Sequence, residues 1–251
     1  MQLHWMKALR EHYQQMRNKY PEEKLLIVFD IEGTIIDMRG IVLYLLQSYD
    51  KEFNKKYFSD LTLDDILFHE SEFDKLKILF YNCSVPDEEV YDVLTWYRTK
   101  FWNSRTMLES HSPFPGVIEI INWLEHQVNT FVGLNTGRSD VLRKDALLSL
   151  NQIAKKSNIK FLSQLLYMNL NILDETVPES KVRGLKYFEE MGYKVICMID
   201  NEPDNLAMIK RDFSHNEDVL LLHADTIFIS KFEEKFDFII QGKEYNLAEF
   251  I

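Results

Sequence analysis

Short runs of apolar residues, without alternating polar positions, recur along the chain. The first, KLLIVF at residues 24–29, stops abruptly at the polar segment DIEGT. Continuous apolar runs of this length are typical of parallel strands that are buried on both faces of a sheet. The pattern predicts four such strands, at residues 24–29, 130–135, 194–199 and 219–224.

Helical patterns separate these predicted strands. The clearest cover residues 117–126, 139–150 and 180–191. Strands that alternate with helices indicate an α/β fold, in which a Rossmann-like parallel sheet carries helices on both faces. After Ala224 the pattern is less regular, and the segments TIFIS and FDFII read either as two short strands or as a strand and a loop.

The N-terminal twenty residues place Trp5, Leu9, Met16 and Tyr20 on one helical stripe. This spacing predicts a helix that packs on the core. Alternatively, the same stripe forms a dimer contact or binds a helix of a partner.

The stretch from about residue 40 to residue 112 has a different pattern. Residues 41–54, 64–81 and 86–102 read as helical, and no strand-like run interrupts them. We predict a helical cap domain at residues 40–112, inserted after the first strand of a core domain formed by residues 1–39 and 113–251. The turn PFPG at 113–116 closes the insertion. We expect its aromatic residues to form mainly its own core, with substrate contact as the alternative: Tyr81, Tyr91, Trp96, Tyr97 and Trp102.

Composition and charge narrow the possible partners. Hydrophobic residues make up 46% of the 251 residues, enough for a real core, and the formal net charge is −11 with a pI near 5.2. Such an acidic chain argues against nucleic acid or an anionic membrane as the main partner. An anionic substrate must then be captured by local positive charge. Monomer and homodimer both remain open.

The two cysteines, Cys83 and Cys197, lie far apart in the sequence and form no C-x-x-C pair. This pattern suits a reducing compartment and predicts neither a disulfide framework nor a structural zinc site. The charged N-terminus lacks the apolar run of a signal peptide, and no uncharged apolar stretch approaches 18 residues. We therefore expect a soluble, cytoplasmic protein.

Polar residues follow three of the four predicted strands. Asp30 ends the first strand, Asn135 to Arg138 end the second, and Asp200 to Asp204 end the third. In open parallel sheets, ligands bind beyond the carboxyl ends of the strands. Carboxylates that meet there repel one another unless a cation lies between them, and oxygen ligands without histidine or cysteine indicate magnesium.

These segments resemble the motifs of the haloacid dehalogenase superfamily, in order and in spacing, from residue 24 to about residue 222. VFDIEGTIIDM at 28–38 is similar to the first motif, and LNTGR at 134–138 is similar to the second. Lys181 lies 19 positions before Asp200, as the third motif requires, and IDNEPDN at 199–205 resembles the fourth. PFPGVIEIINWL resembles the segment in which the chain returns from a helical cap of the C1 type.

The resemblance implies a magnesium-dependent phosphatase that hydrolyses a small phosphorylated metabolite. Asp30 is the implied nucleophile, which forms an aspartyl-phosphate, and the implied metal ligands are Asp30, the Glu32 carbonyl, Asp200 and Asp204. Thr136 and Lys181 are implied to bind the phosphoryl group and to take part in catalysis. Gly137 and Arg138 are expected beside the substrate, although an ion pair at the surface is the alternative for Arg138.

One residue departs from the usual motif, because Glu32 stands where the superfamily has an aspartate as general acid. Glutamate offers the same acid on one more methylene, so we expect it to act as the acid and base. Three alternatives remain, namely a phosphomutase, another phosphotransferase with the same Asp30 intermediate, and an inactive relative that binds ligands. The common nucleotide-binding motifs G-x-x-x-x-G-K-[ST] and G-x-G-x-x-G do not occur.

Overall fold

A computed structural model describes residues 4–68, 73–170, 175–226 and 238–250 of the chain. It divides into two compact units, each of which is described by itself. Met1–Ile36 and Pro113–Ile251 form the first, the core unit, and Asp37–Ser112 form the second, the helical unit. Among the described residues, no helix combines the length and the apolar character needed to cross a membrane.

The core unit is built on a six-stranded sheet in which every neighbouring pair of strands is parallel. The strand order is β3-β2-β1-β4-β5-β6. The strands are β1 (Leu25–Phe29), β2 (Thr130–Ser139), β3 (Leu166–Asn169), β4 (Lys194–Asp200), β5 (Leu220–Ala224) and β6 (Ile240–Gly242). All five residues of β1 are buried, as their uninterrupted apolar sequence requires. The predicted parallel α/β fold is confirmed.

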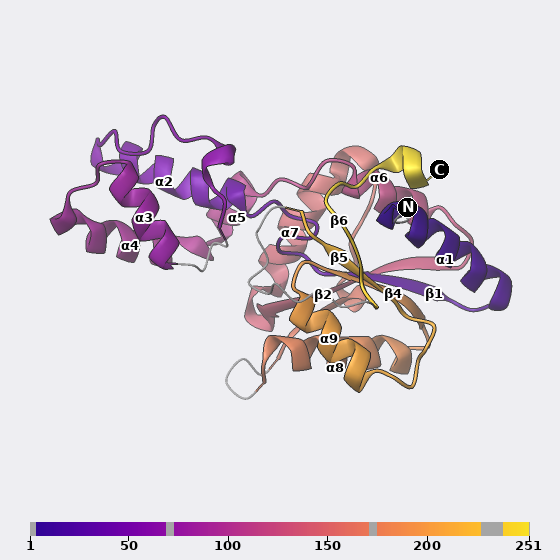
Figure 1. Ribbon diagram of the computed structural model, residues 1–251. Coiled ribbons are helices and arrows are strands. Elements are labelled where there is room, and N and C mark those ends of the chain that lie inside the picture. The colour runs from indigo at the N-terminus through magenta and orange to yellow at the C-terminus, as the bar shows by residue number, and fades with distance from the viewer. Residues whose placement is uncertain (1–3, 69–72, 171–174, 227–237, 251) are drawn as a thin grey trace. The chain divides into compact units, whose positions relative to one another are not determined.

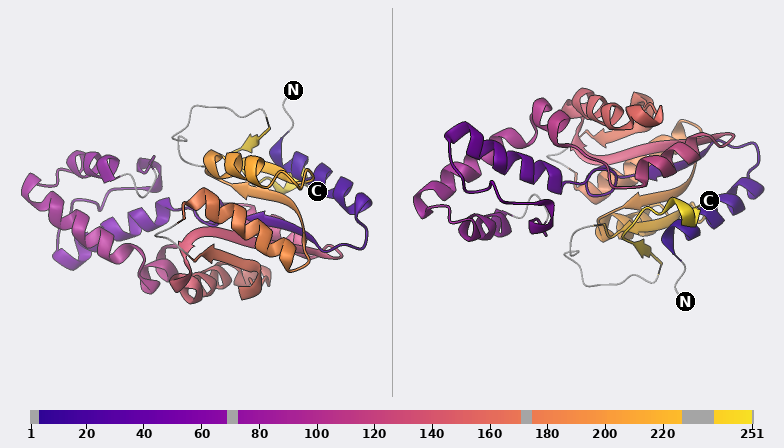
Figure 2. Two further views of the ribbon diagram at one scale, coloured as in Figure 1. Left: turned by 90° about the horizontal axis from the view of Figure 1, so that it is seen from below. Right: turned by 90° about the horizontal axis from the view of Figure 1, so that it is seen from above.

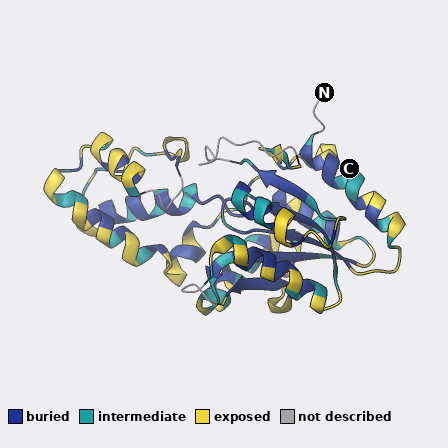
Figure 3. Cartoon of the chain, turned by 60° about the horizontal axis from the view of Figure 1, so that its bottom comes forward, coloured by how far each residue is buried: buried dark blue, intermediate teal, exposed yellow. Residues whose placement is uncertain are grey.

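Helices cover both faces of this sheet (Figure 1). On one face lie α1 (Trp5–Lys19) and α6 (Val117–Glu125), and on the other lie α8 (Val177–Glu190) and α9 (Pro203–Asp212). The helices α7 (Arg143–Ala154) and α10 (Leu247–Phe250) complete the core unit. The strands and the inward sides of these helices form the buried centre (Figure 3).

The N-terminal helix packs on the core unit, as its stripe of apolar residues predicted. Trp5, Leu9 and Met16 are buried, and Tyr20 lies just beyond the last turn of α1, where it is half-buried. Two further views show α1 beside the C-terminal segment that ends in α10 (Figure 2). Helices α1 and α10 therefore lie together on one side of the core unit.

Three features of the core unit differ from the sequence prediction. Strand β2 continues to Ser139, so Thr136 and Arg138 lie within the strand, and helix α7 begins only at Arg143. The short edge strand β3 escaped prediction because four residues carry no distinct pattern, and β6 was anticipated only as a possible strand in FDFII. Most of the segment TIFIS lies outside the described residues, and FDFII contributes only Ile240 to β6.

The helical unit contains α2 (Arg39–Phe53), α3 (Phe73–Asn82), α4 (Asp87–Phe101) and α5 (Ser104–Ser110), with a 3-10 turn at Leu63–Asp65. The single helix predicted at 64–81 is wrong, because residues 66–68 are not helical and α3 begins at Phe73 among the described residues. The prediction of an aromatic core is also wrong for most of its members. Tyr97 is buried, whereas Tyr81 and Tyr91 are each 74% exposed. The buried stripe of α4 consists of Val93, Leu94, Tyr97 and Phe101 instead.

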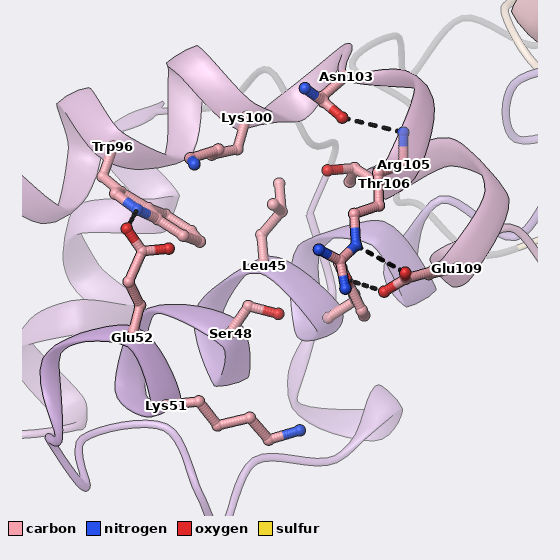
Figure 4. Close-up of a pocket in the computed structure, with 11 residues that line it drawn as sticks. Leu45, Ser48, Lys51, Glu52, Trp96, Lys100, Asn103, Arg105, Thr106 and Glu109 are labelled. Atoms are coloured by element: carbon pink, nitrogen blue, oxygen red, sulfur yellow. Dashed lines mark hydrogen bonds and ion pairs between the residues drawn. The ribbon is translucent and has the colours of Figure 1, made fainter.

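A cavity of about 500 Å³ lies within the helical unit, between α2, α4 and α5 (Figure 4). Polar groups on its walls contact one another. The indole N–H of Trp96 donates to Glu52 at 3.2 Å, and Arg105 Nε donates to Glu109 at 2.7 Å. Arg105 and Glu109 thus neutralise each other within the unit.

Candidate active site

The loop that follows β1 is a tight turn stabilised by its own backbone. The amide of Asp30 still bonds across the sheet to the Ile199 carbonyl at 2.8 Å. Beyond it, the amides of Ile35 and Ile36 both donate to the Ile31 carbonyl, and that of Gly33 donates to the Ile36 carbonyl. Gly33 has a φ of +73°, and a Cβ there would lie 2.4 Å from the Asn201 side-chain nitrogen. Glycine is therefore required at this point of the turn.

Lys181 lies at the centre of the site, in the second turn of α8. Thr176 begins this helix with a capping box that it forms with Glu179, which places Lys181 against the ends of the strands. The ammonium group contacts Asp30 Oδ1 and the Asn135 carbonyl, and it lies 3.1 Å from Asp200 Oδ2. Lys181 is only 1% exposed, so its charge is compensated entirely by these groups.

Asp200 ends strand β4 and is completely buried. Its Oδ1 accepts hydrogen bonds from the Glu202 amide and from the Asn205 side chain, both at 2.9 Å. These two donors fix the carboxylate so that Oδ2 is left to face Lys181. Asn205, in the first turn of α9, thus contacts Asp200 directly.

Glu32 is held by two residues of β2. Its Oε2 accepts a hydrogen bond from the Thr136 hydroxyl at 2.6 Å, and its Oε1 forms an ion pair with Arg138 Nε. The Thr136 hydroxyl oxygen also accepts a hydrogen bond from the Arg138 amide at 3.1 Å. Arg138 is 6% exposed, so the alternative of a surface ion pair is wrong and the pair is a buried one.

Burial dominates the electrostatics of Asp30. It raises the pKa of this carboxyl well above its ordinary value, and repulsion from Asp200 and Glu32 acts in the same direction, against the attraction of Lys181. Burial alone would lower the pKa of Lys181, but the carboxylates of Asp200 and Asp30 raise it above its ordinary value. Two buried acids, Asp30 and Asp200, therefore share the Lys181 ammonium group, and Glu32 beside them is paired with Arg138.

The donor set fits a divalent cation of the hard type. Asp30 Oδ2 is buried and has no hydrogen-bond partner, and Asp200 presents Oδ2 beside it at the same ammonium group. Carboxylate oxygens of this kind suit magnesium. Within the described part of the chain, three or more His, Cys, Asp or Glu side chains do not gather in a metal-binding group. The further ligands that the motif implies are the Glu32 carbonyl and Asp204.

The residues singled out from the sequence are largely brought together. Asp30, Lys181 and Asp200 are in contact, and Glu32, Thr136 and Arg138 form the adjoining cluster. Asp204 lies in the first turn of α9, and Gly137 packs closely on Val177 at the start of α8.

Sequence reasoning did not single out the roles of Asn135 and Asn205. The Asn135 side chain donates to the Lys181 backbone carbonyl at 2.8 Å, and the backbone carbonyl of Asn135 accepts a hydrogen bond from the Lys181 ammonium. Both asparagines lie inside the quoted motifs, and their amides were the only available signal.

Comparison with solved structures identifies the fold. One similar structure is that of a protein from Clostridium difficile that is assigned as a phosphatase. It gives a TM-score of 0.55 and 15% identity, covering 90% of this chain and 97% of that one. A HAD-superfamily hydrolase of subfamily IA from Geobacter sulfurreducens gives a TM-score of 0.52 and 12% identity, covering 89% and 93% of the two chains. The chain has the fold of the haloacid dehalogenase superfamily.

A third structure with this haloacid dehalogenase fold, from Thermotoga maritima, is assigned as a β-phosphoglucomutase. Its TM-score is 0.52 at 14% identity, with 88% of this chain and 94% of that chain covered. No family model and no curated protein matches the sequence. At these identities the likeness establishes the fold, and the chemistry has to be argued from the site.

Proposed function

We propose that this protein is a magnesium-dependent phosphatase that hydrolyses a small phosphorylated metabolite through an aspartyl-phosphate on Asp30. One observation carries the proposal. Asp30 and Asp200 are buried side by side on the Lys181 ammonium, and one oxygen of Asp30 has no hydrogen-bond partner. Two buried carboxylates are costly to keep unless they serve a cation or a reaction.

In the proposed first step, a carboxylate oxygen of Asp30 attacks phosphorus. The new O–P bond forms as the bond from phosphorus to the leaving oxygen breaks. Glu32, which has to be protonated in the complex with substrate, delivers that proton to the leaving oxygen. Lys181 offsets the negative charge that gathers on the phosphoryl oxygens. When bound by Asp30, Asp200 and the Glu32 carbonyl, magnesium supplies further neutralisation of the phosphate charge.

In the proposed second step, water replaces Asp30 on phosphorus. Glu32, which gave up its proton in the first step, takes one from the attacking water, and inorganic phosphate leaves while the Asp30 carboxylate is restored. In the free protein, contacts with Thr136 and Arg138 hold the Glu32 carboxylate in one orientation. The longer side chain of glutamate is thereby given a defined position.

Thr136 is the proposed ligand of a phosphoryl oxygen, beside the backbone of Gly137 and the side chains of Arg138 and Lys181. In the free protein its hydroxyl donates to Glu32. Substrate would therefore compete with Glu32 for the hydrogen bond from the Thr136 hydroxyl. Binding would then change the contacts of Glu32 when it has to act as the acid. We also propose that residues 40–112 act as a cap that selects the leaving group. The proposed location of the protein is the cytoplasm.

The direct experiment is to measure release of inorganic phosphate from an aryl phosphate with magnesium present. We expect turnover that a chelator abolishes and that added magnesium restores, and we expect none from Asp30→Asn. Full activity in the chelator would contradict the metal assignment. Transfer to a second hydroxyl compound, with no release of phosphate, would indicate a phosphomutase or another phosphotransferase. The absence of both activities would indicate a binding protein.

A further inference from the structure

Two hydroxyl groups from the C-terminal part of the chain bond to the loop that carries Asp30 and Glu32. Thr226 Oγ1 donates to the Gly33 carbonyl at 2.6 Å, and the Tyr245 hydroxyl donates to the Thr34 carbonyl at 2.9 Å. The two acceptors are consecutive in the sequence. Their donors lie 193 and 211 residues away, so neither bond is part of the local turn.

These bonds complete the loop's hydrogen bonding from outside. Within the turn, the amides of Gly33, Ile35 and Ile36 already bond to carbonyls of Ile31 and Ile36. The carbonyls of Gly33 and Thr34 are the groups that the two hydroxyls engage. The turn defines its own shape, and the hydroxyls fix where that shape lies relative to β5 and β6.

The N-terminal helix places Tyr245. The rings of Trp5 and Tyr245 are 4.8 Å apart at 51°, and the Trp5 indole N–H donates to the Glu244 carbonyl at 2.8 Å. Gly242 lies so close to this indole that a Cβ would be 2.0 Å from Trp5 Cδ1. Trp5 is 1% exposed and Tyr245 is 5% exposed. The first helix therefore determines where the tyrosine hydroxyl is presented.

The pairing of β5 with β6 places Thr226. Ala224 is in register with Gly242, and the Asp225 amide donates to the Gly242 carbonyl at 2.9 Å. Thr226 comes directly after Asp225 in the sequence.

Burial raises the pKa of Tyr245 well above its ordinary value, so its hydroxyl keeps its proton and remains a hydrogen-bond donor.

We propose that Thr226 and Tyr245 are positioning residues that hold the Asp30–Thr34 loop in its reactive geometry, with Trp5 and Gly242 as their support. This inference rests on the proposed phosphatase function for its catalytic consequence. It assigns a role to both ends of the chain. In-line transfer is sensitive to small displacements of the nucleophile, so loosening the loop should lower kcat more than it weakens substrate binding.

The test compares Tyr245→Phe and Thr226→Val with two controls. Tyr187→Phe removes the hydroxyl of a half-buried tyrosine of α8, which donates an exposed hydrogen bond to the Gln164 carbonyl at 3.3 Å. Thr226→Ser keeps the hydroxyl. With an aryl phosphate and magnesium, we expect kcat to fall about 5- to 10-fold in each test variant, the range that one hydrogen bond supports, with KM nearly unchanged. Tyr187→Phe and Thr226→Ser should match the wild type.

Hydrogen exchange of the peptide covering residues 30–36 supplies a readout that needs no activity. We expect its amides to exchange faster in Tyr245→Phe and Thr226→Val, and at the wild-type rate in the two controls. Unchanged exchange in folded test variants would overturn the proposal, as would faster exchange with wild-type kcat. If the wild type hydrolyses nothing, the proposed function fails and the exchange data still decide whether the hydroxyls hold the loop. If Tyr245→Phe does not fold, the valine and serine variants at Thr226 decide alone.

Discussion

The hydroxyl of Thr136 donates a hydrogen bond to the carboxylate of Glu32, with 2.6 Å between Oγ1 and Oε2. Glu32 lies in the loop after β1 and Thr136 lies within β2, 104 positions apart in the sequence. The contact joins the proposed phosphate ligand to the proposed acid and base before substrate binds. It also gives the one departure from the usual motif, glutamate for aspartate, a specific partner in β2.

Removing the Thr136 hydroxyl should impair catalysis. Thr136→Val deletes the donor at nearly constant volume, and we expect kcat/KM for an aryl phosphate to fall about 10- to 100-fold because a charge-assisted hydrogen bond in the transition state is lost. Thr136→Ser retains the donor and should recover most of the rate. Steady-state kinetics of the two variants settle the matter, and a valine variant as fast as the serine variant would contradict the role.

Removing one partner of the buried ion pair between Arg138 and Glu32 should destabilise the folded protein. Arg138→Met leaves Glu32 without its cation, and we expect the free energy of unfolding in urea to drop by about 3 kcal/mol. Adding Glu32→Gln to this variant should restore part of the loss, because no charge is then left unpaired.

Arg105→Met is the matched control, because the side chain of Arg105 is 81% exposed in its pair with Glu109. We expect little change in its unfolding free energy. Equal losses at positions 105 and 138 would contradict the view that burial makes the second pair important.

The N-terminal helix should contribute stability that depends on pH. Hydrogen bonds from Lys19 and Tyr20 lower the pKa of Asp218 to about 2. A carboxyl whose pKa is lowered by folding stabilises the protein above its unfolded pKa, near 3.9, and the contribution is lost as the pH falls from about 4 towards 2.

Asp218→Asn should therefore lower Tm by about 2 °C at pH 7, a modest effect because Lys19 is largely in solvent. The difference from wild type should shrink below pH 4, as measured by thermal denaturation. A difference that grows on acidification would contradict this account of Asp218.

Much of the central site could be located from the sequence because parallel strands bring their carboxyl ends to one edge. Asp30 and Asp200 end neighbouring strands, and Lys181 lies in a helix whose start is marked by Thr176 and Glu179. These are local signals: an apolar run that stops, and a capping box. The fold class followed from the same runs.

The parts that escaped prediction depend on contacts that are distant in the sequence. Nothing near Tyr245 or Thr226 indicates that their hydroxyls reach residues 33 and 34. Arg138 could equally have lain at the surface, since only the course of β2 decides that it faces Glu32. In the helical unit, Tyr91 lies outside the buried stripe of α4 and is exposed, which counting aromatic residues alone did not reveal.

The central claim is that Asp30 becomes phosphorylated, and Glu32→Gln allows that species to be trapped. An aryl phosphate needs little protonation to leave, so the first step should proceed in this variant, whereas activation of water should be slowed by roughly 10²- to 10⁴-fold. Mass spectrometry of the rapidly quenched variant should show about 80 Da, one phosphoryl group, added to the peptide that carries Asp30, and none in the double variant with Asp30→Asn. Continued turnover without that mass increase, or a phosphoryl group on another residue, would contradict the mechanism.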